Sequence, residues 1–415
     1  VFEGQVWAFN HEECTADLKE FDTSQMDVFG GLDVGYKDPT AFCVIAYDWD
    51  KKKYYLVDEY MDAERTTEQH AIEIKKLIDK GKIDSQKESE IINNINFSNN
   101  IESLKPCDLV IEAIIENIEI KKKVFADLEE IVSQTCILAS NTSSLSITSI
   151  ASACINPEKV IGIHFFNPAT LMPLVEIIPG IATKPIVTEH CKSLLDSWKK
   201  TTVVAKDTPG FIVNRIARPF YSEALRIFEE GIADISTIDW AMKEIGGFKM
   251  GPFELMDLIG HDVNYTVTET VWTQFYYDPK FKPSISQKRL LEAGFLGRKS
   301  GKGFYNYNEN NEQPKAKNDL ILGELIFKRI LVMLINEAAD ALYFKIATVE
   351  DIDLAMTKGV NYPKGLLKWA DDLGIENIVN DLKKLYLLYQ EDRYRISPIL
   401  KQMLEQKIYL FHKTI

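Results

Sequence analysis

The sequence predicts an α/β domain built on part of a doubly wound sheet, with a foreign β-meander before it and an all-α domain of two repeats after it. Three observations lead to this prediction. Short β-type runs fill residues 1–80, strand-like and helical patterns alternate over residues 95–205, and helical periodicity dominates from residue 207 onward. Alternation of the second kind is typical of a sheet that is covered by helices.

Length, charge and cysteine usage limit the class of protein. The chain has 415 residues, enough for two or three domains, and its net charge of −14 disfavours nonspecific binding to nucleic acid or anionic membranes. Its six cysteines are widely spaced without a C-x-x-C pair, which indicates reduced, packed thiols. No basic leader precedes an apolar run, so we expect a cytoplasmic protein with neither a membrane nor a nucleic-acid partner.

The first two predicted segments are rich in strands. In residues 1–80, candidate strands lie at 28–34, 41–47 and 54–59, and a helix follows Thr66. In residues 81–206, the apolar runs 108–114, 136–140 and 160–165 are typical of parallel strands buried on both faces. A helical pattern over residues 116–132 separates the first two of these runs.

The helical part contains an internal repeat. Glu223, Asp239 and Met242 recur 114 residues later as Glu337, Asp353 and Met356. A match of residues 250–252 with 362–364 implies a short deletion, and we expect two repeats at 207–310 and 320–415. Asp207 ahead of Pro209 predicts a capped helix start at the first repeat.

Polar residues follow the predicted strands at their carboxyl ends, where ligands bind in open α/β sheets. Glu112 and Glu116 border the first strand, Asn141-Thr142-Ser143-Ser144 follows the second, and His164 ends the third. Imidazole transfers protons near neutral pH, and Glu176, twelve residues later, is placed to orient it.

Each of these residues also has an ordinary structural interpretation. His164 alone is read as a satisfied core histidine, and Glu176 as a solvated rim charge. Ser143 is read as a helix cap, and Asn214 as a local hydrogen-bonding residue. Only their combination points to a catalytic site.

Six segments resemble the L-3-hydroxyacyl-CoA dehydrogenases in order: NTSSL (141–145), GIHFFNP (162–168), LVE (174–176), DTPGFIVNR (207–215), MGPFELMDLIG (250–260) and GRKSGKGFY (297–305). The resemblance covers about residues 82–400. The second helical repeat is similar to that of bacterial two-repeat members, including enzymes of aromatic-acid degradation. The resemblance implies a Rossmann-like fold, an acyl-CoA substrate, NAD as cofactor, and a homodimer through the helical domain unless the second repeat replaces the partner.

The resemblance also implies roles for matched positions. His164 would remove the 3-hydroxyl proton while hydride leaves C3 for NAD, and Glu176 would orient the imidazole. Ser143 and Asn214 would hydrogen-bond the reacting oxygen or the thioester carbonyl. Near the cofactor the matched positions are Glu116, Lys121 and Asn141.

The sequence departs from the family at its start. The G-x-G-x-x-G loop is missing, because Gly30, Gly31 and Gly35 lack its spacing, so we expect weakened NAD binding. Instead GLDVGYKDPT (31–40) resembles the start of the RNase H-like nuclease domain of phage terminase large subunits, with Asp33 as its first metal-binding carboxylate. The later metal-binding carboxylates of that domain should follow residue 80, where the dehydrogenase resemblance has already begun.

Three hypotheses follow: a 3-hydroxyacyl-CoA dehydrogenase, an acyl-CoA-binding chain deficient in catalysis, and, distantly, a metal-dependent nuclease. We also expect residues 28–34 to pair with residues 109–114, because the missing first strand would otherwise leave that edge bare.

Overall fold

A computed structural model describes residues 41–48, 53–61, 95–98, 100–167, 169, 172–308 and 313–406. The chain divides into two compact units, Val1–Asp207 and Thr208–Ile415. The strand expected at 28–34, the helix after Thr66, and Asp33 lie outside the described residues.

The first unit is built on one mixed sheet with the strand order β3-β2-β1-β4-β5-β6-β7-β8. The strands are β1 Ala41–Asp48, β2 Lys53–Met61, β3 Ile95–Ser98, β4 Leu109–Glu112, β5 Ile137–Ser140, β6 Val160–Phe165, β7 Leu174–Pro179 and β8 Thr201–Val204. Its helices are α3 Ile118–Ile131, α4 Ile147–Ala151 and α5 Pro185–Ser197. The predicted strands in the described segments are confirmed, and β3, β7 and β8 are additional.

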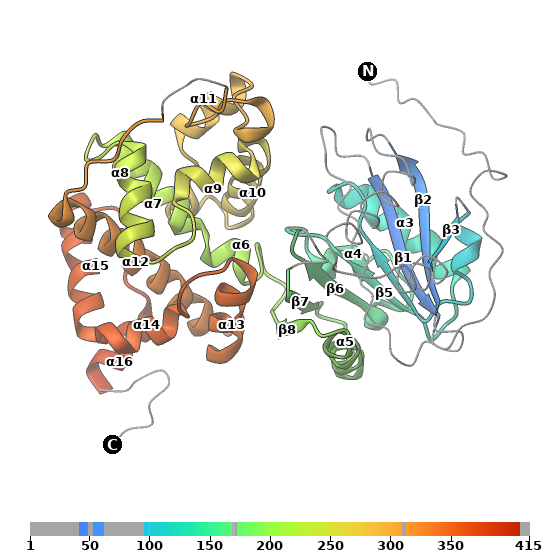
Figure 1. Ribbon diagram of the computed structural model, residues 1–415. Helices are drawn as coiled ribbons and strands as arrows, with labels where there is room; N and C mark the ends of the chain where they lie inside the picture. Colours follow the sequence, from blue (N-terminus) through green and yellow to red (C-terminus); the bar gives the residue numbers. More distant parts are fainter. Residues whose placement is uncertain are drawn as a thin grey trace. The chain divides into compact units, whose positions relative to one another are not determined.

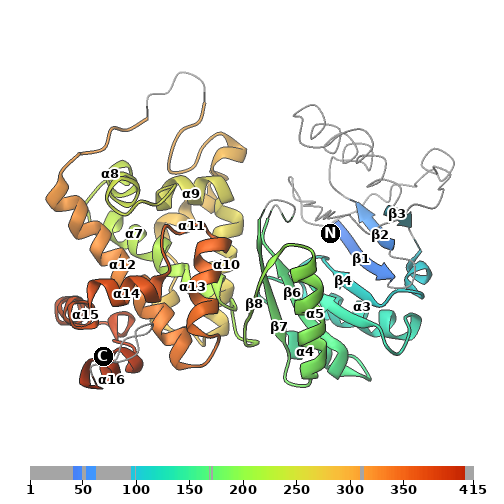
Figure 2. The same ribbon diagram turned by 60° about the horizontal axis from the view of Figure 1, so that its bottom comes forward.

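The strand beside β4 is not the one that was expected. β1 lies between β2 and β4 and is antiparallel to both, with Val44 opposite Glu112 and Tyr47 opposite Leu109 (Figure 2). β5 pairs with the other edge of β4. The predicted pairing of residues 28–34 with 109–114 is therefore wrong, because both edges of β4 are already used. The meander does cover the free edge of β4, but with its second predicted strand, which is β1 in the structure.

The alternation of side chains sorts the central strands into two faces. One face carries Leu109, Ile111, Ile161 and Ile163, which pack in a core with residues of α5. The opposite face carries the polar residues Glu112, Ser140, His164 and Glu176. Glu112 is opposite Ser140, Ser140 is opposite Gly162, and His164, two residues after Gly162, is opposite Glu176. His164 and Glu176 therefore share one face of the sheet with Glu112 and Ser140.

A glycine allows α4 to lie directly on that face. A Cβ at Gly162 would come within 2.8 Å of the Ile147 side chain on α4 and 2.9 Å of Ile178 on β7. Any larger residue would push α4 away from the sheet. Because residues 141–146 connect β5 to α4, this close contact also fixes the loop that carries Ser143.

The second unit is helical (Figure 1). Its helices are α6 Val213–Ile216, α7 Arg218–Glu229, α8 Ile235–Trp240, α9 Pro252–Ile259, α10 His261–Gln274, α11 Ile285–Glu292, α12 Leu320–Tyr343, α13 Val349–Gly359, α14 Leu366–Leu373, α15 Ile375–Tyr389 and α16 Pro398–Gln406. The long helix α12 is buried on nearly every side from Ile326 to Ala341, as expected for a helix at the centre of a bundle.

The two repeats keep one register throughout. Asp239 accepts hydrogen bonds from the backbone N–H groups of Phe253 and Glu254, both at 2.9 Å. Asp353 makes the same pair of bonds, at 2.8 Å, with residues 367 and 368. Helices α9 and α14 also begin 114 residues apart, at positions 252 and 366. The expected short deletion is therefore wrong, and residue 251 corresponds to residue 365.

Reciprocal ion pairs join the repeats. Arg215 Nε lies 2.6 Å from Glu337 Oε1, and Arg329 Nε lies 3.0 Å from Glu223 Oε2. The two arginines are 114 residues apart in the sequence, and so are the two glutamates. Each repeat therefore contributes an arginine to one ion pair and a glutamate to the other. All four side chains are at most 4% exposed.

The composition also predicts packed thiols and no membrane-spanning segment. None of the four described cysteines forms a disulfide, and burial raises the pKa of the Cys191 thiol to about 12. Among the described helices, none is both long and apolar enough to cross a membrane.

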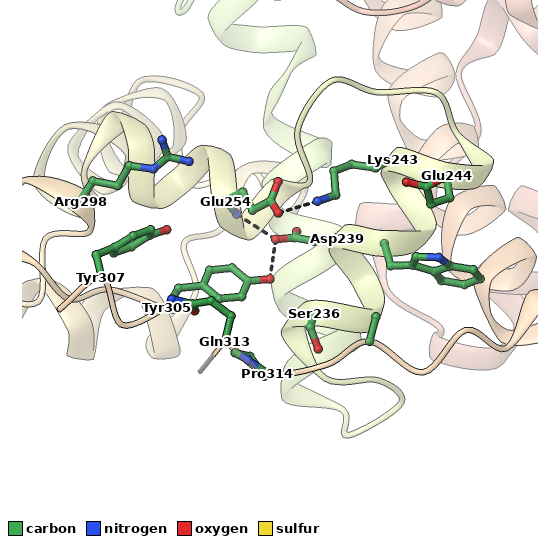
Figure 3. A pocket seen from close by; sticks show the side chains of 12 residues that line it. Ser236, Asp239, Lys243, Glu244, Glu254, Arg298, Tyr305, Tyr307, Gln313 and Pro314 are labelled. Carbon is green, nitrogen blue, oxygen red and sulfur yellow. Dashed lines mark hydrogen bonds and ion pairs between the residues drawn. The ribbon is translucent and has the colours of Figure 1, made fainter. Parts of the chain in front are cut away.

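We predict a pH-dependent stability contribution from Asp239 (Figure 3). Burial raises its pKa from 3.8 to about 7, although hydrogen bonds from Phe253, Tyr305 and Glu254 oppose the shift. The folded state therefore binds the proton more tightly than the unfolded state, and this stabilisation is full below about pH 4 and lost as pH rises through 7. Urea unfolding at pH 5 and pH 8 should show that wild type loses more stability than Asp239→Asn. An equal loss in both proteins would contradict the assignment.

Candidate active site

The antiparallel pairing of β6 and β7 places a histidine and a glutamate directly opposite each other. His164 and Glu176 are register partners, and His164 Nδ1 lies 2.7 Å from Glu176 Oε2. Glu176 is fully buried and the His164 side chain is 7% exposed. The ring of Phe166 lies against the imidazole, with centroids 4.6 Å apart.

This geometry determines which imidazole nitrogen can act as a base. An ionised carboxylate only accepts hydrogen bonds, so the contact assigns the proton of the neutral imidazole to Nδ1. The basic lone pair is then on Nε2. A second proton taken up at Nε2 would give an imidazolium that the Glu176 carboxylate stabilises.

A buried ion pair lies on the same face of the sheet. Lys121 Nζ is 2.6 Å from Glu112 Oε1, with exposures of 1% and 0%, and the Ser140 hydroxyl donates to Glu112 Oε2 at 2.6 Å. Asn117 caps the start of α3 and so sets Lys121 in its first turn. The role of Ser140 was missed, although the period of two places it on the same face as Glu112.

Glu116 organises the loop after β5. Its Oε1 accepts from the Thr142 hydroxyl at 2.6 Å and from the backbone N–H groups of Ser143 and Ser144 at 3.1 Å. Burial opposes ionisation of Glu116, but Lys121 and these donors outweigh it and lower its pKa. Glu116 and Lys121, both predicted for the cofactor side, therefore lie together with Ser143.

Asn141 connects this loop to the histidine. Its backbone N–H donates to the Glu112 carbonyl at 2.7 Å, and its side-chain oxygen accepts from Phe165 N–H at 2.8 Å. Since Phe165 follows His164, Asn141 holds the end of β6. Six of the seven predicted residues belong to the first unit and lie together at one edge of its sheet: His164, Glu176, Ser143, Glu116, Lys121 and Asn141.

Two capping predictions are corrected by these contacts. The cap of α4 is Ser146, which accepts from Ser149 N–H, and not Ser143. Asp207 does not cap a following helix either. Its carboxylate accepts from the N–H groups of Ile147 at 3.0 Å and Thr148 at 2.7 Å, because the chain turns after Asp207 and α6 begins only at Val213. Asp207 therefore helps to anchor α4 and the Ser143 loop.

Asn214 lies on α6 in the second unit. Within the fully described stretch from Gly210 to Ile227, it is the only residue that is partly exposed, while the others are buried. The neighbouring residue Arg215 forms a buried ion pair with Glu337. The proposed contact of Asn214 with the substrate stays a prediction.

The first strands do not fit the diphosphate of a dinucleotide. A dinucleotide site needs a strand, a Gly-rich turn and a helix whose N-terminus faces the phosphates. Here only four residues separate β1 from β2, and β1 runs antiparallel to β4. The carboxyl end of β1 therefore lies at the opposite sheet edge from those of β4 and β5. Side chains predicted for the nicotinamide half are present, but β1 and β2 build no phosphate cradle.

A separate cavity of about 340 Å³ lies in the second unit, beside Asp239, Tyr305 and Lys243 (Figure 3). None of the predicted site residues lines it. Its polar groups bond one another, with Tyr305 donating to Asp239 at 2.8 Å and Lys243 to Glu254 at 2.6 Å. We therefore place the candidate site at the sheet edge and not in this cavity.

We predict that Lys121→Met strongly destabilises the first unit. The substitution leaves the buried Glu112 carboxylate without its cation, which costs about 3–5 kcal/mol of unfolding free energy. Lys122→Met is the matched control, because Lys122 is 30% exposed and 3.8 Å from Glu119, and should cost less than about 1 kcal/mol. Similar urea midpoints for the two variants would contradict the prediction.

Comparisons with known proteins cover most of the chain. Residues 51–208 match the 3-hydroxyacyl-CoA dehydrogenase NAD-binding domain, and residues 210–307 and 325–409 match the C-terminal domain of that family. The first match begins before residue 82, where the motif resemblance starts. It therefore includes β2 and the segment leading to β3.

Individual relatives agree with the domain matches. The 3-hydroxyadipyl-CoA dehydrogenase of Escherichia coli K12 is 35% identical over 410 residues, covering 78% of this chain and 86% of the relative. The 3-hydroxybutyryl-CoA dehydrogenase of Clostridioides difficile is 43% identical over 236 residues, covering 57% of this chain and 84% of that protein. A crystal structure of 3-hydroxybutyryl-CoA dehydrogenase from E. coli K12 superposes with a TM-score of 0.78 at 34% identity, covering 82% of this chain and 90% of that one. The chain therefore belongs to the 3-hydroxyacyl-CoA dehydrogenase family of NAD-dependent oxidoreductases.

Proposed function

We propose that the reaction centre of this chain acts on C3 of a 3-hydroxyacyl-CoA, with His164 as the general base. The observation that carries the proposal is the buried His164–Glu176 pair, 2.7 Å apart at the carboxyl edge of the sheet. His164 Nε2 takes the proton of the 3-hydroxyl group as the C3 hydride leaves. Glu176 stabilises the resulting imidazolium, so the chain's own residues account for the proton half of the oxidation.

The remaining predicted residues position the reactants in this proposal. Ser143 and Asn214 hydrogen-bond the oxygen on C3 or the thioester carbonyl. Glu116, Lys121 and Asn141 hold the nicotinamide side, and Glu116 restrains the Ser143 loop through the bonds described above. NAD, when bound, supplies the hydride acceptor.

We propose further that NAD binds weakly to this chain. Among the described residues, β1 and β2 are joined by only four residues and are not followed by a helix N-terminus for the phosphates, which such a terminus attracts by about 0.3–1 kcal/mol or more. A second candidate function follows: an acyl-CoA-binding protein with impaired turnover. We favour descent from a dehydrogenase as the origin of the chain. For the behaviour of this polypeptide we favour acyl-CoA binding with impaired turnover.

We also make proposals about the origin of residues 1–80, the role of the second repeat and the location of the protein. We propose that residues 1–80 derive from the start of a terminase-like nuclease domain and retain no nuclease activity. The dehydrogenase match from residue 51 onward overlaps residues 51–80 of this segment. DNA cleavage with Mg²⁺ or Mn²⁺ that is lost in Asp33→Asn would contradict this. The reciprocal ion pairs support a second repeat that takes the place of a dimer partner within one chain. The protein acts in the cytoplasm and binds no nucleic acid.

Calorimetry with NADH tests the cofactor proposal. We expect a Kd weaker than about 1 mM, a binding free energy below about 4 kcal/mol, because the phosphate cradle is missing. Titrations in the presence and absence of acetoacetyl-CoA should agree on this limit. Micromolar binding would show that the chain builds a working cofactor site by another route.

Kinetics of a histidine variant test the reaction centre. Loss of a general base lowers the rate about 10²–10⁴-fold, so His164→Gln should lower kcat for acetoacetyl-CoA reduction by at least about 100-fold at high NADH. His190→Gln, which changes an exposed histidine on α5, is the matched control and should leave kcat unchanged. A decrease of less than about tenfold in His164→Gln would refute the assignment of His164 as the base.

A further inference from the structure

One buried arginine of the second unit has no carboxylate partner among the described residues. Arg218, the first residue of α7, is 5% exposed. Its two hydrogen bonds both leave from Nη1, to Thr268 Oγ1 at 2.9 Å and to the Asn264 carbonyl at 3.5 Å, and its Nε has no partner. Arginine stays protonated in proteins, and a buried arginine is almost always paired with an anion.

Two tyrosines surround this guanidinium. The Arg218 Cζ atom lies 5.0 Å from the centre of the Tyr221 ring. Helix α13 packs on α6, and Tyr362 follows α13 close to Arg218, whose charge acts on the Tyr362 phenol. The Tyr362 hydroxyl is buried and has no hydrogen-bond partner among the described residues. We call Arg218, Tyr221 and Tyr362 the arginine cluster.

The other repeat shows that the fold does not need this cluster. Counted with the 114-residue register, Arg218 corresponds to Val332 and Tyr362 corresponds to Phe248, and Tyr221 corresponds to Ile335. All three counterparts are apolar and at most 5% exposed. By contrast, the structural ion pairs are kept in both repeats. The cluster therefore adds a cation and a hydroxyl group where packing requires neither.

We infer that the arginine cluster binds the terminal carboxylate of the acyl chain, so that the preferred ligand is a dicarboxylic acyl-CoA. A guanidinium edge and a neighbouring hydroxyl group match a carboxylate, which accepts two N–H bonds from arginine and further bonds from a phenol. The cluster supplies one cation, which balances the single negative charge of a carboxylate. This inference rests on the proposed function, because it uses the predicted contact of Asn214 with the acyl group.

The position of Asn214 relative to Arg218 supports an acyl-chain ligand. Asn214 lies on α6 and Arg218 is the first residue of α7, four positions later. Ala217, which links the two helices, keeps a helical conformation (φ −75°, ψ −12°), so the rise from Asn214 to Arg218 is about 6 Å. Asn214 is partly exposed and Arg218 is buried. An acyl group whose oxygen contacts Asn214 would direct its far end toward Arg218. A spacing of about 6 Å suits a short methylene chain that ends in a carboxylate.

Calorimetry with two six-carbon ligands, adipyl-CoA and hexanoyl-CoA, tests the inference without turnover or NAD. A charge-assisted hydrogen-bonded contact is worth roughly a 10- to 100-fold gain in affinity, so adipyl-CoA should bind that much more tightly. Arg218→Met should abolish the preference while leaving hexanoyl-CoA affinity unchanged. Tyr362→Phe, which installs the residue found at position 248, should reduce the preference by a smaller factor.

Controls separate specificity from folding and from the proposed function. Arg289→Met, at an arginine that is 72% exposed, should change neither affinity. A melting temperature of Arg218→Met at or above that of wild type would show that the variant folds, because a buried unpaired charge has been removed. If adipyl-CoA and hexanoyl-CoA bind equally, or if Arg218→Met keeps the preference, the inference about the arginine cluster is wrong while the proposed function is unaffected. If neither binds, the proposed function fails with it. If free adipate binds as tightly as adipyl-CoA, the cluster is a site for free carboxylic acids and the acyl-chain assignment is overturned.

Discussion

The antiparallel register of β6 and β7 is the constraint on which the candidate site depends. It places His164 opposite Glu176, and the pleat then turns both side chains to the face that also carries Glu112 and Ser140. A shift of one residue in this pairing would send the imidazole to the opposite face, into the apolar core beneath α5. The core on that side therefore holds the reaction centre in register from the opposite face of the sheet.

Much of this arrangement could be predicted from the sequence. The strand runs at 108–114, 136–140 and 160–165 and the position of His164 follow from apolar runs and from polar residues at their ends. The partnership with Glu176 also follows, once the chain is assumed to fold back. The function of Asp207 could not be predicted, because a carboxylate that binds the first N–H groups of a helix 60 residues earlier in the sequence leaves no local pattern. The identity of the strand next to β4 could not be predicted either. Any extended segment can form backbone hydrogen bonds with a free strand edge, and the sequence offered three candidate strands.

The repeat was visible in the sequence, but its register was not fully so. Identical pairs such as Glu223 and Glu337 fix the offset, whereas in Met250-Gly251-Pro252 only the glycine has an identical counterpart, Gly365. Hydrogen bonds establish the alignment of the repeats where residue identities do not. Asp239 and Asp353 each accept hydrogen bonds from backbone N–H groups at the start of a helix, and these groups are present in both repeats whatever the side chains. Side chains that do differ between the repeats, such as Arg218 and Val332, are then the places to look for what each repeat does separately.

The hairpin beside β4 has a consequence for how such a protein can arise. β1 and β2 join through a four-residue connection, so their pairing is local and needs no crossover helix. The edge of β4 recognises backbone N–H and C=O groups and does not distinguish among side chains. Under the proposed origin of residues 1–80, a half-sheet without its first strand would be open to repair by a hairpin of adequate length. Such an exchange would restore the shape of the sheet without the chemistry of the original loop, so architecture and cofactor recognition could be inherited separately.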